Sequence, residues 1–343
     1  MTNKIETAKT DTVLSVRDLR TEFRGDRGPV RVLDDISFDV GRGKIVGLVG
    51  ESGSGKSMTA LSLMGLVPKP QGHVSATRMD LDGTDLAKLS PDGLRRIRGR
   101  DISMVFQEPM TSLNPVRKVW EQVGEPLAIH QGLKRRDIRA RVLEMFEMVG
   151  IPDPKARLDA YPHQLSGGLR QRAMIAMGLI CEPKLLIADE PTTALDVTTQ
   201  AQILRLMQDL RDRVGTSIIL ITHDLGIIAE MCDEVNVMYA GQIIEQANVF
   251  DLFERPSHPY TRGLLASIPK ATEQRSSHRM PSIPGMVPNL AKLPPGCRFS
   301  PRCGDAMPIC LQKEPGLADL GRGHNARCWL HLPHDATTQR EAS

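Results

Sequence analysis

The sequence has no run of the roughly 20 apolar residues that a membrane-spanning helix needs, and it has no excess of charge of either sign. Its 44 Lys and Arg residues nearly balance its 41 Asp and Glu residues. Composition therefore gives no indication of binding to nucleic acid or to anionic lipid. The first residues, MTNKIETAKTDT, contain no apolar stretch and are not typical of a signal peptide. We expect a protein that is made and kept in the cytosol.

Cysteine is also scarce, and the six cysteines are unevenly distributed. Four of them lie in the last fifth of the chain, in a segment rich in Pro and Gly. Structural disulfides are uncommon in the cytosol, so clustered cysteines there favour metal binding or redox chemistry. The other two, Cys181 and Cys232, lie in apolar surroundings and are expected to belong to the core.

The order of apolar segments predicts an α/β fold. Strands are expected over residues 13–19, 30–40, 44–50, 77–86, 102–107, 184–189, 217–224 and 235–246, and helices over 57–66, 90–99, most of 115–182, 199–215 and 225–233. Ile138, Val142, Met145, Phe146 and Val149 recur at helical spacing. From residue 184 onward, continuously apolar strands alternate with helices, which indicates a parallel sheet covered on both faces.

The regular pattern ends near residue 253, where the sequence becomes punctuated by Pro. We therefore expect a first domain over residues 12–253, with a helical subdomain over about 115–182. A C-terminal extension is expected over residues 254–335. Residues 1–11 and 336–343 are expected to be flexible tails.

The segment GESGSGKS, residues 50–57, fits the pattern G-x-x-x-x-G-K-[ST], and it follows an apolar strand and opens a helix. Its glycines allow backbone N–H groups to face phosphate oxygens, and the helix N-terminus adds partial positive charge. Lys56 is expected to reach the β- and γ-phosphates, and Ser57 to bind Mg²⁺. The expected nucleotide-binding residues here are Gly50, Glu51, Ser52, Gly53, Ser54, Gly55, Lys56, Ser57 and Met58.

The segment LLIADE ends in two acids, Asp189 and Glu190. A buried strand that delivers a carboxylate beside a phosphate-binding loop holds the metal ion in such folds. Asp189 is therefore expected next to Mg²⁺. Glu190 is expected to be the general base that polarises the attacking water.

The segment LSGGLRQR, residues 165–172, resembles the signature motif of the ATP-binding-cassette (ABC) ATPases. Gln107 of FQEP resembles the Q-loop of that family, Asp196 of TALD the D-loop, and His223 of THD the switch histidine. Phe23 lies where the family places an aromatic residue that stacks on adenine. The resemblance implies a P-loop ABC ATPase fold, in which a parallel-sheet core carries a β-rich and a helical subdomain. A small cysteine-containing C-terminal extension would be added to it.

The resemblance also implies a role for each motif. The catalytic residues would be Glu190, Gln107 and His223, and the Mg²⁺ ligands would be Ser57, Gln107 and Asp189. Two cassettes pair head to tail in this family, so that the signature of one closes on ATP held by the other. ATP would bind the closed state selectively, and hydrolysis would reopen it. The signature residues are Leu165, Ser166, Gly167 and Gly168.

Three further segments resemble the oligopeptide/dipeptide/nickel importer branch of the family: FQEPMTSLNPV, RPSHPYTRGLLASIP and IPGMVPNL…PPGCRFSPRC. This implies a peripheral ATPase at the cytoplasmic face of the cell membrane that couples ATP hydrolysis to uptake of di- or oligopeptides. Its partners would be a second homologous ATPase in a heterodimer, two transmembrane permease subunits and an extracytoplasmic solute-binding protein, with no nucleic acid. Nickel chelates, glutathione or oligosaccharides are alternative solutes.

Two other classes of function stay open. Some ABC ATPases act off the membrane, in translation or DNA repair, but those carry two cassettes in one chain or a long coiled-coil insertion. This chain has one cassette and neither insertion. In the other class, the cassette would be the scaffold of a metal or redox sensor located in the tail.

The tail cysteines are separated by five, six and seventeen residues, without the paired C-x₂₋₄-C spacing of structural zinc sites. His324, His331 and His334 could serve as further zinc ligands. A segment of roughly fifty residues that is short of large apolar side chains needs a staple in order to fold. Four Cys is the ligand count of a [4Fe–4S] cluster, and members of this branch with this cysteine pattern are associated with one. We expect such a cluster, with zinc and with free thiols or disulfides as alternatives, on Cys297, Cys303, Cys310 and Cys328.

Overall fold

The computed structural model describes residues 11–25, 28–107, 112–193, 195–268 and 282–333. Apart from Asp11, the two predicted tails lie outside these ranges, as do residues 108–111 of FQEPMTSLNPV and residues 269–281 of the predicted extension. Over the described ranges, no helix is long and apolar enough to span a bilayer.

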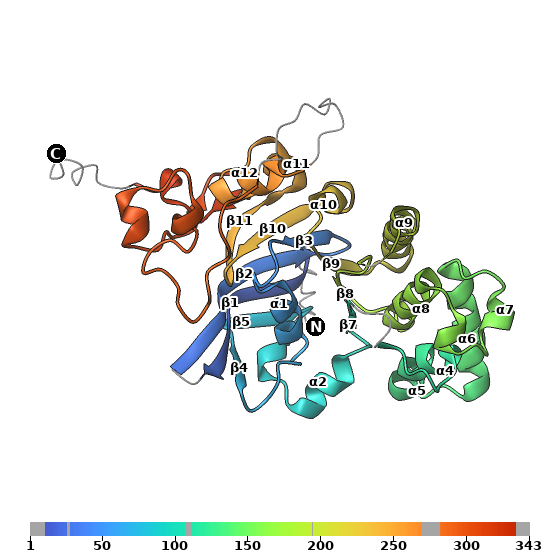
Figure 1. Cartoon of the computed structure of the whole chain (residues 1–343). Coiled ribbons are helices and arrows are strands. Elements are labelled where there is room, and N and C mark those ends of the chain that lie inside the picture. Colours follow the sequence, from blue (N-terminus) through green and yellow to red (C-terminus); the bar gives the residue numbers. More distant parts are fainter. Residues whose placement is uncertain (1–10, 26–27, 108–111, 194, 269–281, 334–343) are drawn as a thin grey trace, which may run out of the picture.

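The centre of the molecule is an eight-stranded sheet (Figure 1). Five parallel strands run from its centre to one edge, in the spatial order β10 (Glu234–Tyr239), β3 (Ile45–Val49), β9 (Ser217–Thr222), β8 (Leu185–Asp189) and β7 (Ile102–Val105). Every residue of β3, β7, β8 and β9 is buried, as strands covered on both faces require. The predicted parallel sheet is therefore confirmed.

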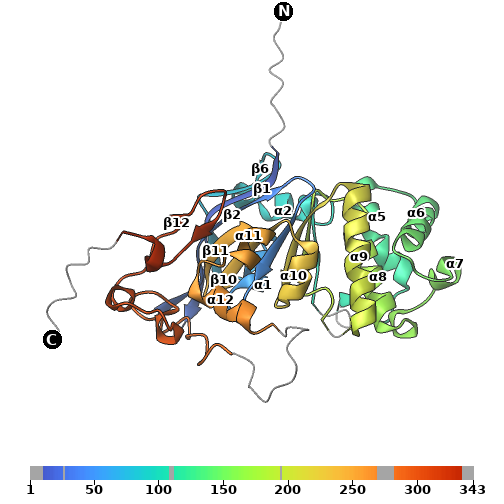
Figure 2. The ribbon, with the colours of Figure 1, turned by 90° about the horizontal axis from the view of Figure 1, so that it is seen from above.

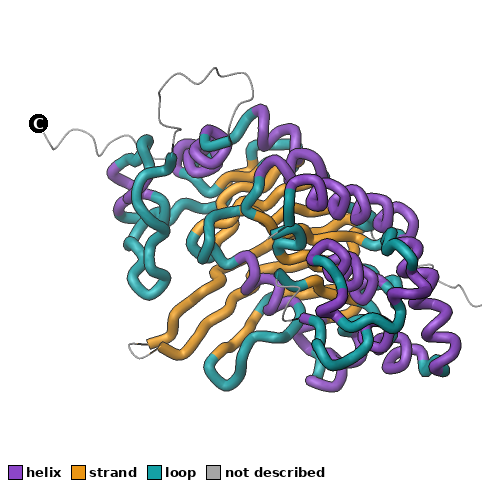
Figure 3. Tube along the Cα trace, turned by 45° about the vertical axis from the view of Figure 1, so that its right-hand side comes forward, coloured by secondary structure: helices purple, strands orange, loops and turns teal. Residues whose placement is uncertain are grey.

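A second, antiparallel sheet packs against the first. Its strands are β2 (Gly28–Gly41), β1 (Thr12–Gly25), β5 (Arg78–Leu81) and β6 (Thr84–Asp85) in that order, and β4 (Gly72–Ser75) also pairs with β1. Helix α1 (Lys56–Leu63) shares one apolar cluster with both sheets, formed by residues such as Leu14, Ile36, Leu48, Leu63 and Ile187. Figure 3 shows the strands gathered at the centre and the helices around them. Helix α1 is thus fixed between two layers, with its N-terminus at the end of β3.

A helical subdomain lies on one side of the main sheet, beyond β7 and β8 (Figures 1 and 2). It contains α4 (Val119–Val123), α5 (Glu125–Gln131), α6 (Arg135–Met148), α7 (Pro154–Arg157) and α8 (Gly167–Leu179). The predicted apolar face of α6 is buried, and Val149, just after the helix ends, is buried as well. Outside this subdomain, the described residues before residue 234 also form the α-helices α2 (Pro91–Ile97), α9 (Val197–Val214) and α10 (Leu225–Met231).

The C-terminal region continues the main sheet instead of forming a separate layer. Strand β11 (Gln242–Asn248) pairs antiparallel with β10, β13 (Asn325–Ala326) pairs with β11, and β12 (Ala318–Asp319) ends the sheet. Between β11 and β12 the chain forms α11 (Val249–Glu254) and α12 (Pro259–Ala266). The described residues after α12 contain little regular structure (Figure 2). Helix α11 spans the boundary that the sequence predicts near residue 253, and that boundary stays a prediction.

Buried charged groups attach this region to the core. The Arg298 side chain, 6% exposed, donates to the carbonyl oxygen of Ala240 at 2.7 Å and pairs with Asp34 of β2. His324 pairs with the fully buried Glu245 of β11, with 2.8 Å between His324 Nε2 and Glu245 Oε1. Since a buried charge is tolerated only when it is paired, these contacts fix where the extension lies on the sheet.

Candidate active site

The loop between β3 and α1 has a backbone shape that depends on glycine. Gly50, Gly53 and Gly55 have φ angles of +148°, +77° and +108°, which L side chains rarely adopt. A Cβ atom at Gly50 would lie 2.2 Å from the carbonyl oxygen of Met238, so the loop is pressed against β10. Ser52 and Gly53 at the loop tip are exposed, whereas Ser54 is buried. Met58 packs against the cluster beneath α1.

Lys56 occupies the interior of this loop. Its Nζ atom donates to the carbonyl oxygens of Gly50 at 2.7 Å and of Glu51 at 3.0 Å. Burial lowers the pKa of Lys56, and the nearby carboxylates of Glu190, Asp189 and Glu51 oppose that shift. A glycine-rich loop at the start of a helix, with a lysine inside it, has the positive charge and the backbone shape that suit phosphate oxygens.

Ser57 and Asp189 face each other across the end of the parallel strands. The Ser57 hydroxyl donates to Asp189 Oδ1 at 3.1 Å. The pKa of Asp189 is raised above its usual value, mainly by burial and also by the neighbouring charge of Glu190. The hydrogen bond from Ser57 opposes this shift. Both residues line an open cleft of about 510 Å³ together with Gln107. The three predicted Mg²⁺ ligands therefore lie around one space, and their oxygens are of the kind that Mg²⁺ prefers.

The other two predicted catalytic residues, Gln107 and His223, both contact the carboxylate of Glu190. Its carboxylate accepts from Gln107 Nε2 at 3.0 Å, from the Thr193 hydroxyl at 2.9 Å, and lies 3.2 Å from His223 Nδ1. The residue itself has a φ of +46°, and its N–H donates to the carbonyl oxygen of Ile221 at 2.9 Å. Thr193 is not among the residues that the sequence predicts, although its place three residues after Glu190 is a usable signal.

The signature residues lie apart from this site in both views, at the start of α8 (Figures 1 and 2). Ser166 caps α8 and Leu165 is buried, while Ser166 and Gly167 are exposed. A Cβ at Gly168 would meet Thr199 at 2.7 Å, and Thr199 in turn donates to Asp196, the cap of α9. The signature and D-loop residues therefore lie near each other, with Ser166 and Gly167 exposed.

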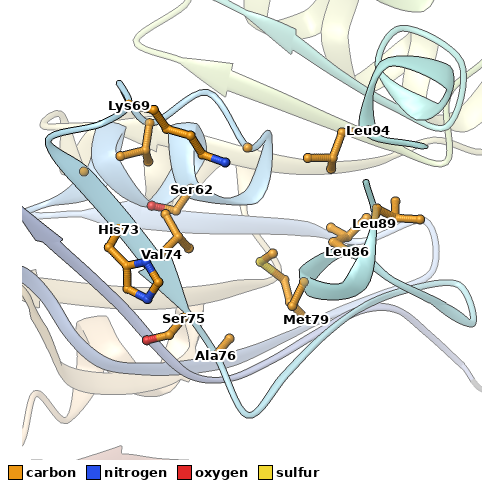
Figure 4. A pocket seen from close by; sticks show the side chains of 14 residues that line it. Ser62, Lys69, His73, Val74, Ser75, Ala76, Met79, Leu86, Leu89 and Leu94 are labelled. Carbon is orange, nitrogen blue, oxygen red and sulfur yellow. The ribbon is translucent and has the colours of Figure 1, made fainter. Parts of the chain in front are cut away.

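Phe23 lies on β1, half-buried, with its ring beside Gly72 of β4. Its predicted stacking on adenine stays a prediction. On the same subdomain, a cavity of about 230 Å³ lies between α1 and β4 (Figure 4). Its lining includes Ser62, His73 and Met79 and none of the predicted nucleotide-binding residues.

The four tail cysteines line one small pocket, together with His258 and Phe299. None of them forms a disulfide. Burial raises the pKa of the Cys297 thiol to about 11, and it also raises the pKa values of Cys303 and Cys328. Among the residues with described positions, no three Cys, His, Asp or Glu side chains are arranged to hold a single metal ion.

The histidines considered as zinc ligands have other partners. His324 pairs with Glu245, and His331 Nε2 lies 3.0 Å from the carbonyl oxygen of Ser257. His334 lies outside the described residues. The two candidate histidines that the structure describes, His324 and His331, thus give the zinc alternative no support.

The sequence predicts nothing of what holds Glu51. The Arg302 guanidinium donates twice to the Glu51 carboxylate, at 2.6 and 3.0 Å. The backbone N–H of Glu51 donates to the Tyr260 hydroxyl at 2.9 Å. Both partners come from the C-terminal region, more than two hundred residues away in the chain. No local pattern marks such a long-range pair.

Comparison with known proteins places these features in a family. Residues 33–193 match the family described as "ABC transporter", and residues 244–310 match "Oligopeptide/dipeptide transporter, C-terminal region". The chain is 52% identical to a probable peptide ABC transporter ATP-binding protein, y4tR, of Sinorhizobium fredii, over 94% of this chain and 96% of that one. It is 49% identical to the oligopeptide transport ATP-binding protein AppD of Bacillus subtilis, over 93% and 97% of the two chains.

Among solved structures, a dimer of the ATP-binding cassette MJ0796 in a post-hydrolysis state, bound to ADP and Pi, superposes with a TM-score of 0.60. It is 26% identical and covers 69% of this chain and 98% of its own. The shared part is therefore the size of a single cassette, and the remainder of this chain has no counterpart in that protein.

Proposed function

The chain belongs to the ABC transporter family, and we infer from this membership that it is the ATP-hydrolysing subunit of a peptide importer. The observation that carries the activity is the arrangement at the ends of β3 and β8. There, the glycine loop with Lys56 lies beside Ser57 and Asp189, and Glu190 is held by two further polar side chains. This arrangement supports in-line attack of water on the γ-phosphate of ATP.

The chain's own residues would divide the work as follows. The loop amides and Lys56 hold the phosphates and stabilise the charge that develops on the transferred phosphoryl group. Glu190 accepts a proton from the attacking water, and Gln107 and His223 hold its carboxylate in place. Ser57, Asp189 and Gln107 would hold Mg²⁺, which supplies positive charge to the phosphate oxygens when it is bound.

We also propose that Ser166, Gly167 and Gly168 complete the ATP site of a second, homologous ATPase subunit. The exposure of Ser166 and Gly167 at the start of α8 and the small size of all three residues support close approach to a nucleotide held by another chain. Two transmembrane permease subunits and an extracytoplasmic solute-binding protein would complete the transporter, with this chain bound peripherally at the cytoplasmic face of the membrane. Phe23 would stack on adenine. Di- and oligopeptides are the favoured solutes, with nickel chelates, glutathione and oligosaccharides as alternatives.

The four tail cysteines are proposed as ligands of a [4Fe–4S] cluster. All four line one pocket and none is in a disulfide, which suits a centre that takes one thiolate at each of four iron atoms. Sulfur atoms around such a cluster lie farther apart than around a single ion, so the lack of a single-ion site among the described residues is compatible with it. When bound, the cluster would anchor four separate points of a segment that has little core of its own.

The catalytic assignment is tested by Glu190→Gln in the full chain, assembled with its partner subunits. The amide cannot accept the proton, so ATP turnover should fall by roughly 100-fold or more while ATP still binds. Steady-state phosphate release and equilibrium ATP binding measure the two quantities.

The matched control is Glu147→Gln, an exposed glutamate of α6, which should leave both quantities unchanged. Normal turnover in Glu190→Gln would reject the assigned base. Tight DNA or ribosome binding by the subunit, without association with a permease, would favour an off-membrane ABC ATPase instead.

A further inference from the structure

The second residue of the phosphate-binding loop is held from outside the nucleotide-binding core. Arg302 donates from Nη1 to Glu51 Oε2 at 2.6 Å and from Nη2 to Glu51 Oε1 at 3.0 Å. A bidentate arginine–carboxylate pair fixes orientation as well as distance. The Arg302 side chain is 4% exposed and that of Glu51 is 31% exposed, so the pair is shielded on the arginine side.

The backbone of the same residue is held by a second group. The Tyr260 hydroxyl accepts a hydrogen bond from Glu51 N–H at 2.9 Å. Tyr260 is fully buried, and its ring packs against Tyr239 and Phe299, with centroid separations of 4.7 and 5.4 Å. A hydroxyl on such an enclosed ring has little freedom to move, so it fixes the direction in which this amide points.

Arg302 is itself held in position before it reaches Glu51. Its Nε atom donates to the carbonyl oxygen of Pro284 at 2.8 Å, and its guanidinium lies over the ring of Tyr239 at 5.8 Å. It ends the 3₁₀ turn Ser300–Arg302 and directly precedes Cys303 of the four-cysteine pocket. The extension therefore presents a pre-ordered cation to the loop.

The position of Glu51 affects the groups that would bind the ATP phosphates. Its carbonyl oxygen accepts from Lys56 Nζ and from the N–H of Ser54, so moving Glu51 moves the groups that face the phosphates. Its carboxylate is also a negative charge in a loop that must accept a polyanion. Arg302 pairs with that charge through both carboxylate oxygens.

We propose that Arg302 and Tyr260 are positioning residues for ATP binding, which hold the side chain and the backbone of Glu51 from the C-terminal extension. The proposal rests on the nucleotide site proposed above. It assigns the extension a part in the ATPase cycle, because a displacement of the extension would release Glu51 and weaken ATP binding.

The test compares binding of the non-hydrolysable analogue Mg–AMP-PNP to full-length variants by calorimetry. Arg302→Met should raise the dissociation constant about tenfold, because it leaves the Glu51 charge unpaired. Tyr260→Phe removes only one hydroxyl and should raise it about threefold. Adding Glu51→Gln to Arg302→Met should restore most of the lost affinity, since no unpaired carboxylate then remains.

Two controls separate positioning from general damage. His324→Gln breaks a buried pair of the same extension away from the loop and should lower thermal stability without changing the dissociation constant. In the assembled transporter, Arg302→Met should raise KM for ATP with little change in kcat, whereas loss of folded protein would lower kcat alone.

Unchanged affinity in both Arg302→Met and Tyr260→Phe would overturn the proposal, as would an Arg302→Met defect that Glu51→Gln does not relieve. Lys56→Ala tests the underlying site separately. If Lys56→Ala binds the analogue as the unaltered chain does, the nucleotide site is wrong. If Lys56→Ala fails to bind while the Arg302 and Tyr260 variants bind normally, only the positioning role is wrong.

Discussion

In the strands β3, β8 and β9 every residue is buried and nearly all are apolar, whereas the buried groups between residues 282 and 333 include Arg298, Arg302 and His324. The core is held by apolar area, which is insensitive to the exact chemistry of any one neighbour. The described part of the extension is attached to the core by a few specific pairs, such as Arg298 with Asp34 and His324 with Glu245. This difference means that the extension can be loosened by a single chemical change while the core stays folded.

The largest expected effect comes from the cysteine pocket. Purified without oxygen, the chain should contain about four iron atoms and acid-labile sulfide, and Cys310→Ser should remove most of the iron. Since the extension would lose its staple, limited proteolysis should then cut within residues 282–333 and leave the core intact. Iron and sulfide assays and mass spectrometry of the fragments measure both effects.

The control for that experiment is Cys232→Ser, at a buried cysteine of the core that should leave the iron content unchanged. A colourless protein with one zinc ion per chain would contradict the cluster. Cleavage of the core at the same rate as the extension would contradict the claim that the extension can be loosened while the core stays folded.

A smaller effect is expected from Arg298→Met. The substitution removes one of the two arginine partners of Asp34, and Arg31 stays paired with it. Because the Arg298 and Asp34 side chains are only 6% and 9% exposed, the loss of this hydrogen-bonded pair should cost about 2 kcal/mol. Hydrogen exchange should show the loss mainly in β2 and the extension. Arg95→Met, which breaks an exposed pair with Asp92, should cost less than about 0.5 kcal/mol. Equal costs for the two variants would mean that the buried pair does not attach the extension.

The smallest effect concerns pH. Burial alone would raise the pKa of Asp34, but the hydrogen bond from Arg31 and the charges of Arg31 and Arg298 outweigh it, and the pKa lies below its usual value. A carboxyl with a lowered pKa stabilises the fold above the unfolded pKa of about 4 and loses that contribution as pH falls below it. Urea unfolding at pH 5 and pH 3 should therefore show a shallower decline for Asp34→Asn than for the unaltered chain. An identical decline would show that protonation of Asp34 does not contribute to the pH dependence of the free energy of unfolding.

The same contrast explains what the sequence could and could not predict. The glycine loop, its lysine and the acids after β8 are contiguous motifs next to strongly apolar strands, so their placement follows from local pattern. The α6 face at Ile138 and Val142 follows from periodicity. Strands β12 and β13 have two residues each, too few for any periodicity to be visible.

The pairing of Arg302 with Glu51 is likewise invisible, because it depends on how two distant segments meet after folding. An arginine in a stretch rich in Pro and Gly is usually solvated, and nothing in RFSPRC indicates burial. The grouping of Gln107, Glu190 and His223 was predicted only through resemblance to a family. Thr193 also donates to Glu190, but a threonine three residues after an acid is too common a pattern to predict that contact.

The two-residue strand β13 has a consequence for how the molecule behaves in solution. It pairs with Glu245 and Gln246 of β11, which would otherwise lie at the open edge of a large sheet. Such edges recruit other chains and lead to stacking and aggregation, and natural proteins blunt them with very short strands or covering loops. With β13 and β12, the C-terminal extension ends the sheet in two very short strands, the kind of edge that offers another chain little to pair with.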